Sequence, residues 1–97
     1  MMTILDNLDL PSPETPLYNH TLPKIEAWLR NQGCHQDSKE LNAWSIETPT
    51  WKAQLWLDVE QISVRYIGAG EGNQDIQRSF KYSLSRQDIE EAVFTGP

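Results

Sequence analysis

The sequence predicts a single α+β domain in which an antiparallel sheet of three to four strands is flanked by one helix before it and one after it. Apolar residues recur at three- and four-residue spacing over residues 21–33 and again after residue 85, and they alternate with polar residues between residues 42 and 84. A chain of 97 residues has material for one hydrophobic core, not two. Because the alternating runs are apolar on one side only, both helices are expected to pack on that side.

The first 20 residues are predicted to form a flexible acidic leader in front of a domain at residues 21–97. They hold three acids and no Lys or Arg, and Pro11, Pro13 and Pro16 withhold backbone donors from helix and sheet alike. The leader contains a secondary candidate for docking on a partner as one helical turn, made of Ile4, Leu5 and Leu8. The alternative is a frayed terminus with no such role.

The first helix is expected over residues 21–33. Thr21 is suited to cap its start, Pro23 is tolerated in its first turn, and Gly33 suits a left-handed turn at its end. The stripe expected to face the sheet consists of Leu22, Ile25, Trp28 and Leu29.

Beyond Gly33 the spacing changes to every second residue, which is typical of strands. A weak first strand is indicated near Cys34, and clearer patterns follow at residues 42–47, 51–59, 62–67 and 76–84. Hairpin turns are expected at residues 58–61 and 68–74. The face expected to point toward the helices carries Trp44, Ile46, Trp51, Ala53, Leu55, Leu57, Val59, Ile62, Val64, Tyr66, Ile76, Arg78, Phe80, Tyr82 and Leu84.

The last helix is expected to begin after Ser85. Its hydroxyl can cap the helix while Asp88, three residues on, reciprocates in a capping box. The inward stripe of this helix is predicted to be Ile89, Ala92 and Val93.

The charge balance argues against nucleic acid as a partner. Fourteen acids against eight bases give a net charge of −6, which repels phosphate backbones at long range. The sequence also has no apolar run long enough to span a bilayer and no secretory signal at its start, so a cytoplasmic protein is expected.

No catalytic residue, metal or cofactor is predicted. Cys34 is the single cysteine, and its neighbour His35 would point to the opposite face of a strand, so neither a metal site nor a nucleophile pair is indicated. The glycine-rich segment 68–72 is not followed by a helix N-terminus, and Glu71 within it would repel phosphate. A hairpin loop is the expected structure there.

The outer face of the predicted sheet, opposite the helices, is the candidate working surface. It is expected to display Trp56, Arg65, Lys81, Lys52 and Ile67. A large aromatic beside Arg is typical of protein interfaces, so a small non-catalytic adaptor or assembly factor is predicted. A homodimer formed through edge strands or through Trp56 remains open.

Three other interpretations of the protein remain. A cationic and aromatic sheet can bind single-stranded RNA by stacking bases on the ring, although three cations are few and Asp58 shares the face. A small enzyme with an unrecognised site would need a deep cleft, for example one lined by Cys34 and His35. Trp56 could also be covered by the leader and have no binding role.

Short phrases in both halves of the chain resemble a family. These are residues 22–29 with Gly33 and Cys34, residues 51–54, residues 66–68, and the run from Arg78 through Phe80, Tyr82, Leu84, Ser85 and Arg86 to residues 88–90. Over residues 20–94 the chain resembles a small domain of unknown function found in cyanobacteria and some plastid proteins. The resemblance implies a cytoplasmic or thylakoid-adjacent setting and a partner in a photosynthesis-related complex. It brings no activity or active residue.

Overall fold

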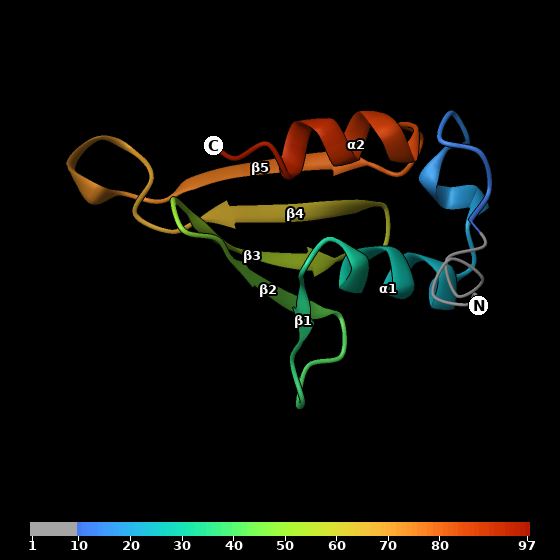
Figure 1. The fold of residues 1–97 in the computed structure, drawn as a ribbon, viewed down its shortest axis with the longest axis horizontal. Coiled ribbons are helices and arrows are strands. Elements are labelled where there is room, and N and C mark those ends of the chain that lie inside the picture. The colour runs from blue at the N-terminus through green and yellow to red at the C-terminus, as the bar shows by residue number, and fades with distance from the viewer. Residues whose placement is uncertain (1–9) are drawn as a thin grey trace.

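The strands lie in the sheet in the order in which they occur in the chain, each antiparallel to the next (Figure 1). A computed structural model describes residues 10–97. Its principal elements are α1 (Leu22–Asn31), β1 (His35–Gln36), β2 (Ala43–Glu47), β3 (Lys52–Leu57), β4 (Gln61–Tyr66), β5 (Ile76–Lys81) and α2 (Arg86–Val93). The α+β class with a helix before and after the sheet is confirmed. The expected number of strands, three to four, is wrong because β1 pairs with β2 as a fifth.

Alternation sorts the strand residues onto two sides. We call the side that faces the helices the helix side; its core positions are Trp44, Ile46, Ala53, Leu55, Ile62, Val64 and Tyr66, all buried. The register places them in rows, since Trp44 pairs with Leu55 and Leu55 with Val64. Their apolar side chains therefore form one continuous surface for the helices to cover.

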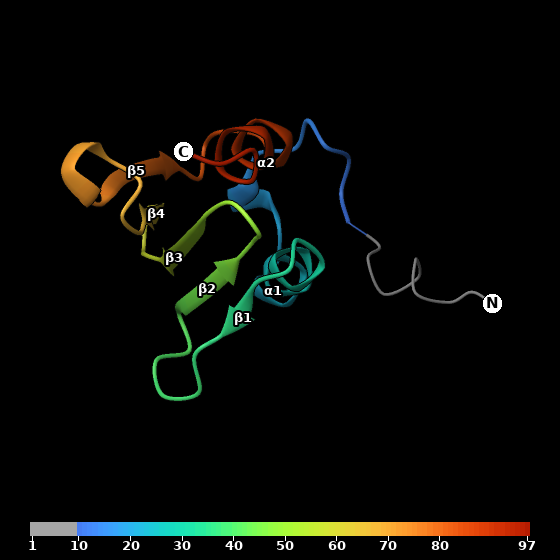
Figure 2. The ribbon, with the colours of Figure 1, turned by 60° about the vertical axis from the view of Figure 1, so that its left-hand side comes forward.

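Both helices cover that one side (Figure 2). Trp28 and Leu29 of α1 and Ile89 and Val93 of α2 are buried with the strand residues in one core cluster. Tyr66 completes the contact with α2, because its hydroxyl donates to the carbonyl of Val93 at 2.7 Å. The prediction that both helices pack on one side of the sheet is therefore confirmed.

The second half of the predicted leader packs on the domain, contrary to the prediction. Leu17 is 0% exposed and belongs to the core cluster. Its amide donates to the carbonyl of Leu84 at 2.9 Å, and the amide of Tyr18 donates to Tyr82 at 3.0 Å. The prolines withhold their own backbone donors but leave the other backbone groups free to bond to a neighbouring segment, and a short 3-10 helix follows Pro16 at Leu17–Asn19; the composition did not reveal this. The predicted docking residues Ile4, Leu5 and Leu8 lie outside the described residues.

Several smaller expectations are wrong at element ends. Leu22 is 57% exposed, because it begins α1 ahead of the turn that meets the sheet, and Val59 is 94% exposed, because it lies in the turn between β3 and β4. Leu84 follows the end of β5 and is exposed. Thr21 makes no side-chain cap bond, whereas Ser85 accepts a hydrogen bond from the amide of Asp88 at 3.0 Å.

In residues 10–97, no helix combines the length and the apolar character needed to cross a membrane.

Candidate functional site

The outer side of the sheet is covered by neither helix (Figure 2). One row of side chains crosses all five strands on this side, and its members are His35, Ser45, Gln54, Arg65 and Gln77. The next row contains Ala43, Trp56, Ser63 and Ser79. The predicted alternation therefore brings an aromatic ring and a guanidinium into adjacent rows on neighbouring strands.

Trp56 and Arg65 form the centre of this surface. The guanidinium carbon of Arg65 lies 5.4 Å from the centroid of the Trp56 ring, within the range of a cation–π contact. The Arg65 group is fixed from two further directions, because its Nη2 donates to Oε1 of Gln54 at 2.6 Å and its Nε lies 3.8 Å from a carboxylate oxygen of Asp75. These contacts hold the side chain in place before any partner arrives, so little conformational entropy remains to be lost on binding.

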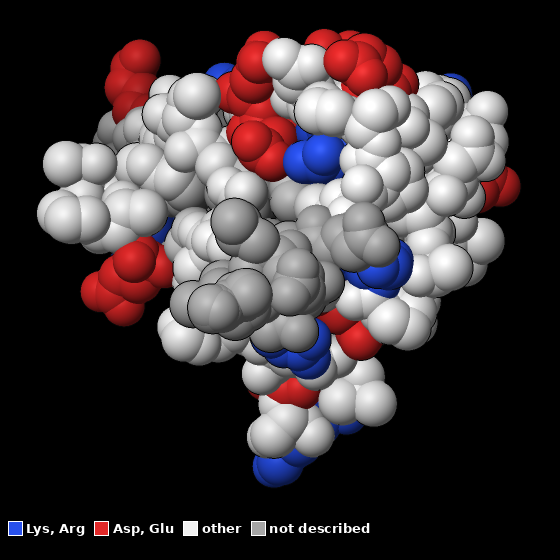
Figure 3. Space-filling view, turned by 45° about the vertical axis from the view of Figure 1, so that its right-hand side comes forward, with Lys and Arg blue, Asp and Glu red and all other residues white. Residues whose placement is uncertain are grey.

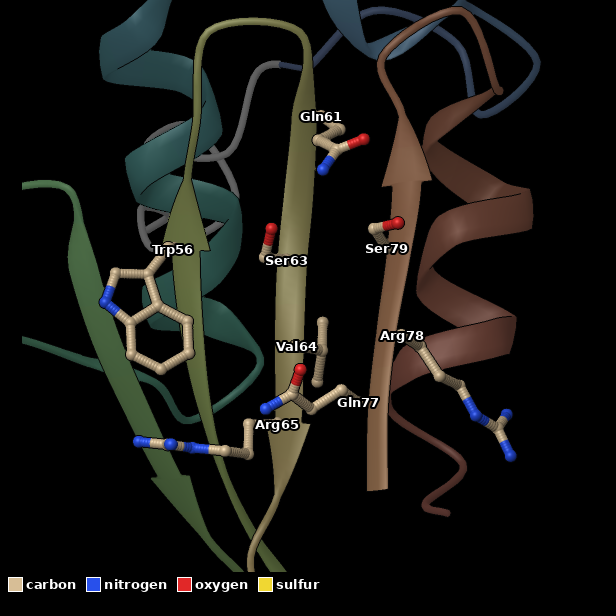
Figure 4. A pocket seen from close by; sticks show the side chains of 8 residues that line it. All are labelled: Trp56, Gln61, Ser63, Val64, Arg65, Gln77, Arg78 and Ser79. Atoms are coloured by element: carbon tan, nitrogen blue, oxygen red, sulfur yellow. The ribbon is translucent and has the colours of Figure 1, made fainter. Parts of the chain in front are cut away.

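A hollow of about 580 Å³ adjoins this pair on the outer side of β3, β4 and β5 (Figure 4). Its lining residues are Trp56, Gln61, Ser63, Val64, Arg65, Gln77, Arg78 and Ser79. Ser63 and Ser79 face each other in the register, and because both are short, the longer side chains around them leave a depression. The Ser63 hydroxyl donates to Asp58 at 2.6 Å. The Arg78 side chain points away from the hollow, toward the side on which α2 lies.

A second hollow, of about 430 Å³, lies on β2 and β3. Lys52 and Ile67 line it with His35, Ser45, Ile46, Glu47, Ala53 and Gln54. The amide of Ile67 donates to the carbonyl of Lys52 at 2.9 Å, so these two candidate residues are direct neighbours. Lys81 lines neither hollow. It pairs with Gln61, which lies at the far end of the first hollow, four residues and roughly 13 Å along β4 from Arg65.

Sequence reasoning did not single out the polar residues between the candidates. Gln54 fixes Arg65, Asp75 adds the ion pair, and Ser63 and Ser79 create the first hollow. The alternation did place Ser63 and Ser79 on the outer side. Their importance follows from being short beside long neighbours, and that depends on which strands pair.

Cys34 and His35 do not assemble into a site. Cys34 is 3% exposed on the core side, and this burial raises the pKa of its thiol from 9.0 to about 12, so it stays protonated at neutral pH. His35 is exposed and lines the second hollow on the opposite side of the sheet. Among residues 10–97 no three His, Cys, Asp or Glu side chains are grouped so that they could hold a metal ion.

These features define a small α+β domain with two helices on one side of a five-stranded antiparallel sheet and a polar outer side with an Arg–Trp pair at its centre. Residues 32–96 match the family described as Protein of unknown function (DUF3143), and since this is more than half of the chain, the chain belongs to that family. The resemblance to an uncharacterised domain is confirmed, with the match beginning after α1. No curated protein and no solved structure matches the chain.

Proposed function

We propose that this domain is a non-catalytic adaptor or assembly factor that binds a protein partner through the outer side of its sheet. Trp56 and Arg65 form the centre of the contact, and Lys52, Ile67 and Lys81 lie around it. The observation that carries the proposal is the fixed Arg65 guanidinium, 5.4 Å from the ring of a partly exposed Trp56, on a side that neither helix covers. Trp and Arg held in place in this way are the residue types that contribute most to protein–protein binding energy.

The charges on this side favour a protein partner over RNA. Of its three cations, Arg65 is already engaged with Asp75, and Asp58 adds a further negative charge beside Ser63. Lys52 and Lys81 alone would remain to meet a phosphate backbone. Single-stranded nucleic acid sites combine a row of cations with several stacking rings, whereas the rows of this side hold the Trp56 indole and, on the far edge strand, the His35 imidazole.

The cellular setting proposed from the resemblance is the cytoplasm or the surface of the thylakoid. The partner proposed on the same ground is a component of a photosynthesis-related complex.

The test is quantitative affinity capture with the full chain and its Trp56→Ser variant. We expect the variant to keep its fold and to bind its specific partner about 10- to 100-fold more weakly, the loss typical of truncating a central aromatic anchor.

The matched control is Tyr18→Ser, which removes an exposed aromatic that belongs to neither row of the outer side. It is expected to capture the same protein as the unchanged chain. Equal capture by the chain and by a folded Trp56→Ser variant would overturn the proposal.

A further inference from the structure

The strand β5 has a neighbour on one side only. It is the last strand of the sheet, and its residues Gln77, Arg78, Ser79 and Lys81 are exposed. At the opposite edge β1 has two residues, whereas β5 has six. An edge strand of this length presents a row of backbone donors and acceptors that another extended segment can use.

The hydrogen-bonding pattern between β4 and β5 shows which backbone donors and acceptors of β5 are not used within the sheet. The amide of Tyr82 donates to the carbonyl of Glu60, so β5 bonds to β4 through its even-numbered residues. The hydrogen bond from the Ile67 amide to the Lys52 carbonyl supports this pattern. It shows that the odd-numbered residues of β4 direct their backbone groups toward β3, which leaves the even-numbered ones for β5. The amides of Gln77, Ser79 and Lys81 therefore point away from the sheet. Within residues 10–97 the amide and carbonyl groups of Gln77 and Ser79 have no other hydrogen-bond partner, while the Lys81 carbonyl accepts from Leu84.

The side chains along this edge have a definite chemistry. Ile76 and Phe80 lie on the helix side, pack against the core and remain partly exposed. Arg78 lies between them, 5.9 Å from the Tyr66 ring centroid, and Lys81 projects on the outer side. The six residues of β5 include two cations and no acid, in a chain of net charge −6.

We infer that the partner of the proposed function contributes an extended segment that adds to β5 as a sixth strand, with acids at the positions beside Arg78 and Lys81 and apolar residues beside Ile76 and Phe80. This rests on the proposed function and deepens it, since the added strand would border the hollow lined by Gln77 and Ser79. Backbone bonding supplies affinity in such additions and the alternating side chains supply specificity.

The proposed segment should carry two acids and not a long acidic run. Acidic side chains gather over the top of the molecule in Figure 3, the side on which α2 lies in Figure 1. The exposed acids of α2 include Asp88 and Glu91, which would repel additional negative charge on the helix side. Apolar residues beside Ile76 and Phe80 would avoid this repulsion and complete the burial of both side chains.

Charge also argues against a second copy as the occupant. Pairing of β5 with β5 of another molecule would bring two strands with two cations each together, within two chains of net charge −6. Cations on an open edge disfavour such self-association. A foreign segment with two matching acids meets no such repulsion.

The inference is tested by selecting binders from a phage-displayed library of random peptides of about ten residues, using the full chain as bait. We expect the selected peptides to carry an apolar residue, an acid and an apolar residue at every second position, facing Ile76, Arg78 and Phe80, and a second acid directly beside the last of these, facing Lys81. They should slow exchange of the Gln77 and Ser79 amides about tenfold or more in nuclear magnetic resonance. Ser79→Pro, which removes an outward amide and leaves the bonds to β4 intact, should weaken binding about tenfold or more.

Ser79→Thr is the matched control, because it keeps the amide and should keep the binding. Circular dichroism of Ser79→Pro checks that the sheet is intact, and if this variant does not fold, amide exchange in the unchanged chain decides the matter. Failure to select peptides, selection of basic ones, or binding without protection of the edge amides would overturn the inference. A dimer in sedimentation equilibrium that Ser79→Pro abolishes would do the same, by making a second copy the occupant.

The two proposals can fail separately. Peptides that depend on Trp56 but bind Ser79→Pro normally would remove the added strand and leave the outer-side contact standing. Captured protein that is insensitive to Trp56→Ser removes the proposed function whatever the peptides do.

Discussion

The two sides of the same five strands differ in what holds their side chains in place. On the helix side Leu55 is 0% exposed and surrounded by core residues, whereas its neighbour Trp56 faces outward and is held beside Arg65 by a cation–π contact. Burial of apolar area stabilises the first side, and contacts among exposed or half-buried groups organise the second. The helix side is therefore expected to contribute most of the stability, and substitutions on the outer side are expected to cost less.

Polar contacts also differ between the two sides, being more buried on the helix side and more exposed to solvent on the outer side. Between the two helices, Oε1 of Glu90 accepts hydrogen bonds from Nε1 of Trp28 at 2.8 Å and from Nε2 of Gln32 at 3.3 Å. Trp28 is nearly fully buried, so few water molecules can replace this acceptor. On the outer side, the ion pair of Arg65 with Asp75 is half-exposed, and solvent screens it.

The comparison would break if two substitutions in β3 had similar effects. Leu55→Ala on the helix side is expected to lower the free energy of unfolding by about 2–5 kcal/mol, because it removes buried methyl groups and leaves a cavity. Lys52→Ala on the outer side should change it by less than about 0.5 kcal/mol. Urea denaturation of both variants measures the difference, and equal losses would contradict the assignment of sides.

Removing the hydrogen bond between Glu90 and Trp28, which joins the two helices, is expected to lower the free energy of unfolding by a smaller amount. Glu90→Ala should cost about 1–3 kcal/mol, since the indole Nε1 of Trp28 loses its acceptor in a buried position. Glu91→Ala, on the exposed side of the same helix, serves as the control and should cost less than about 0.5 kcal/mol. Similar thermal unfolding of the two variants would show that Glu90 does not join the helices.

The pH dependence sharpens the comparison further. The pKa of Cys34 is raised from 9.0 to about 12 by burial, and that of Tyr82 from 10.0 to about 12 by burial and by the nearby Asp58 charge. The unfolded chain therefore loses these protons first, so the stability is fully present below pH 9 and falls as the pH rises from 9 toward 12. Between pH 9 and 10 the Cys34 thiol contributes most of the loss, and its share should not exceed about 1.4 kcal/mol.

The matched variant is Cys34→Ala, which should be less stable overall but lose little between pH 9 and 10. Urea titrations at pH 8, 9 and 10 measure this. A fall of equal size in both proteins over that interval would assign the alkaline effect to another group.

The alternation of residues predicted most of the sheet, and it failed where the chain turns. Trp44, Leu55 and Val64 were assigned to the helix side correctly, because a two-residue repeat fixes the side on which each side chain lies. Val59 continued the repeat into a turn, where the strand geometry no longer applies. For the candidate site, the repeat placed Trp56 and Arg65 on the outer side, but it could not give their mutual distance.

By itself, the sequence determined the α+β class, the two helices, the side of most strand residues and the acidic balance, because these depend on local spacing and composition. The tertiary structure alone decided that Leu17 joins the core, that Glu90 links the helices, and that Gln54 and Asp75 hold Arg65 beside Trp56. It also decided that β5 ends the sheet with outward amides. The physical reason is that each of these contacts joins residues on different elements, and local periodicity carries no information about which elements become neighbours.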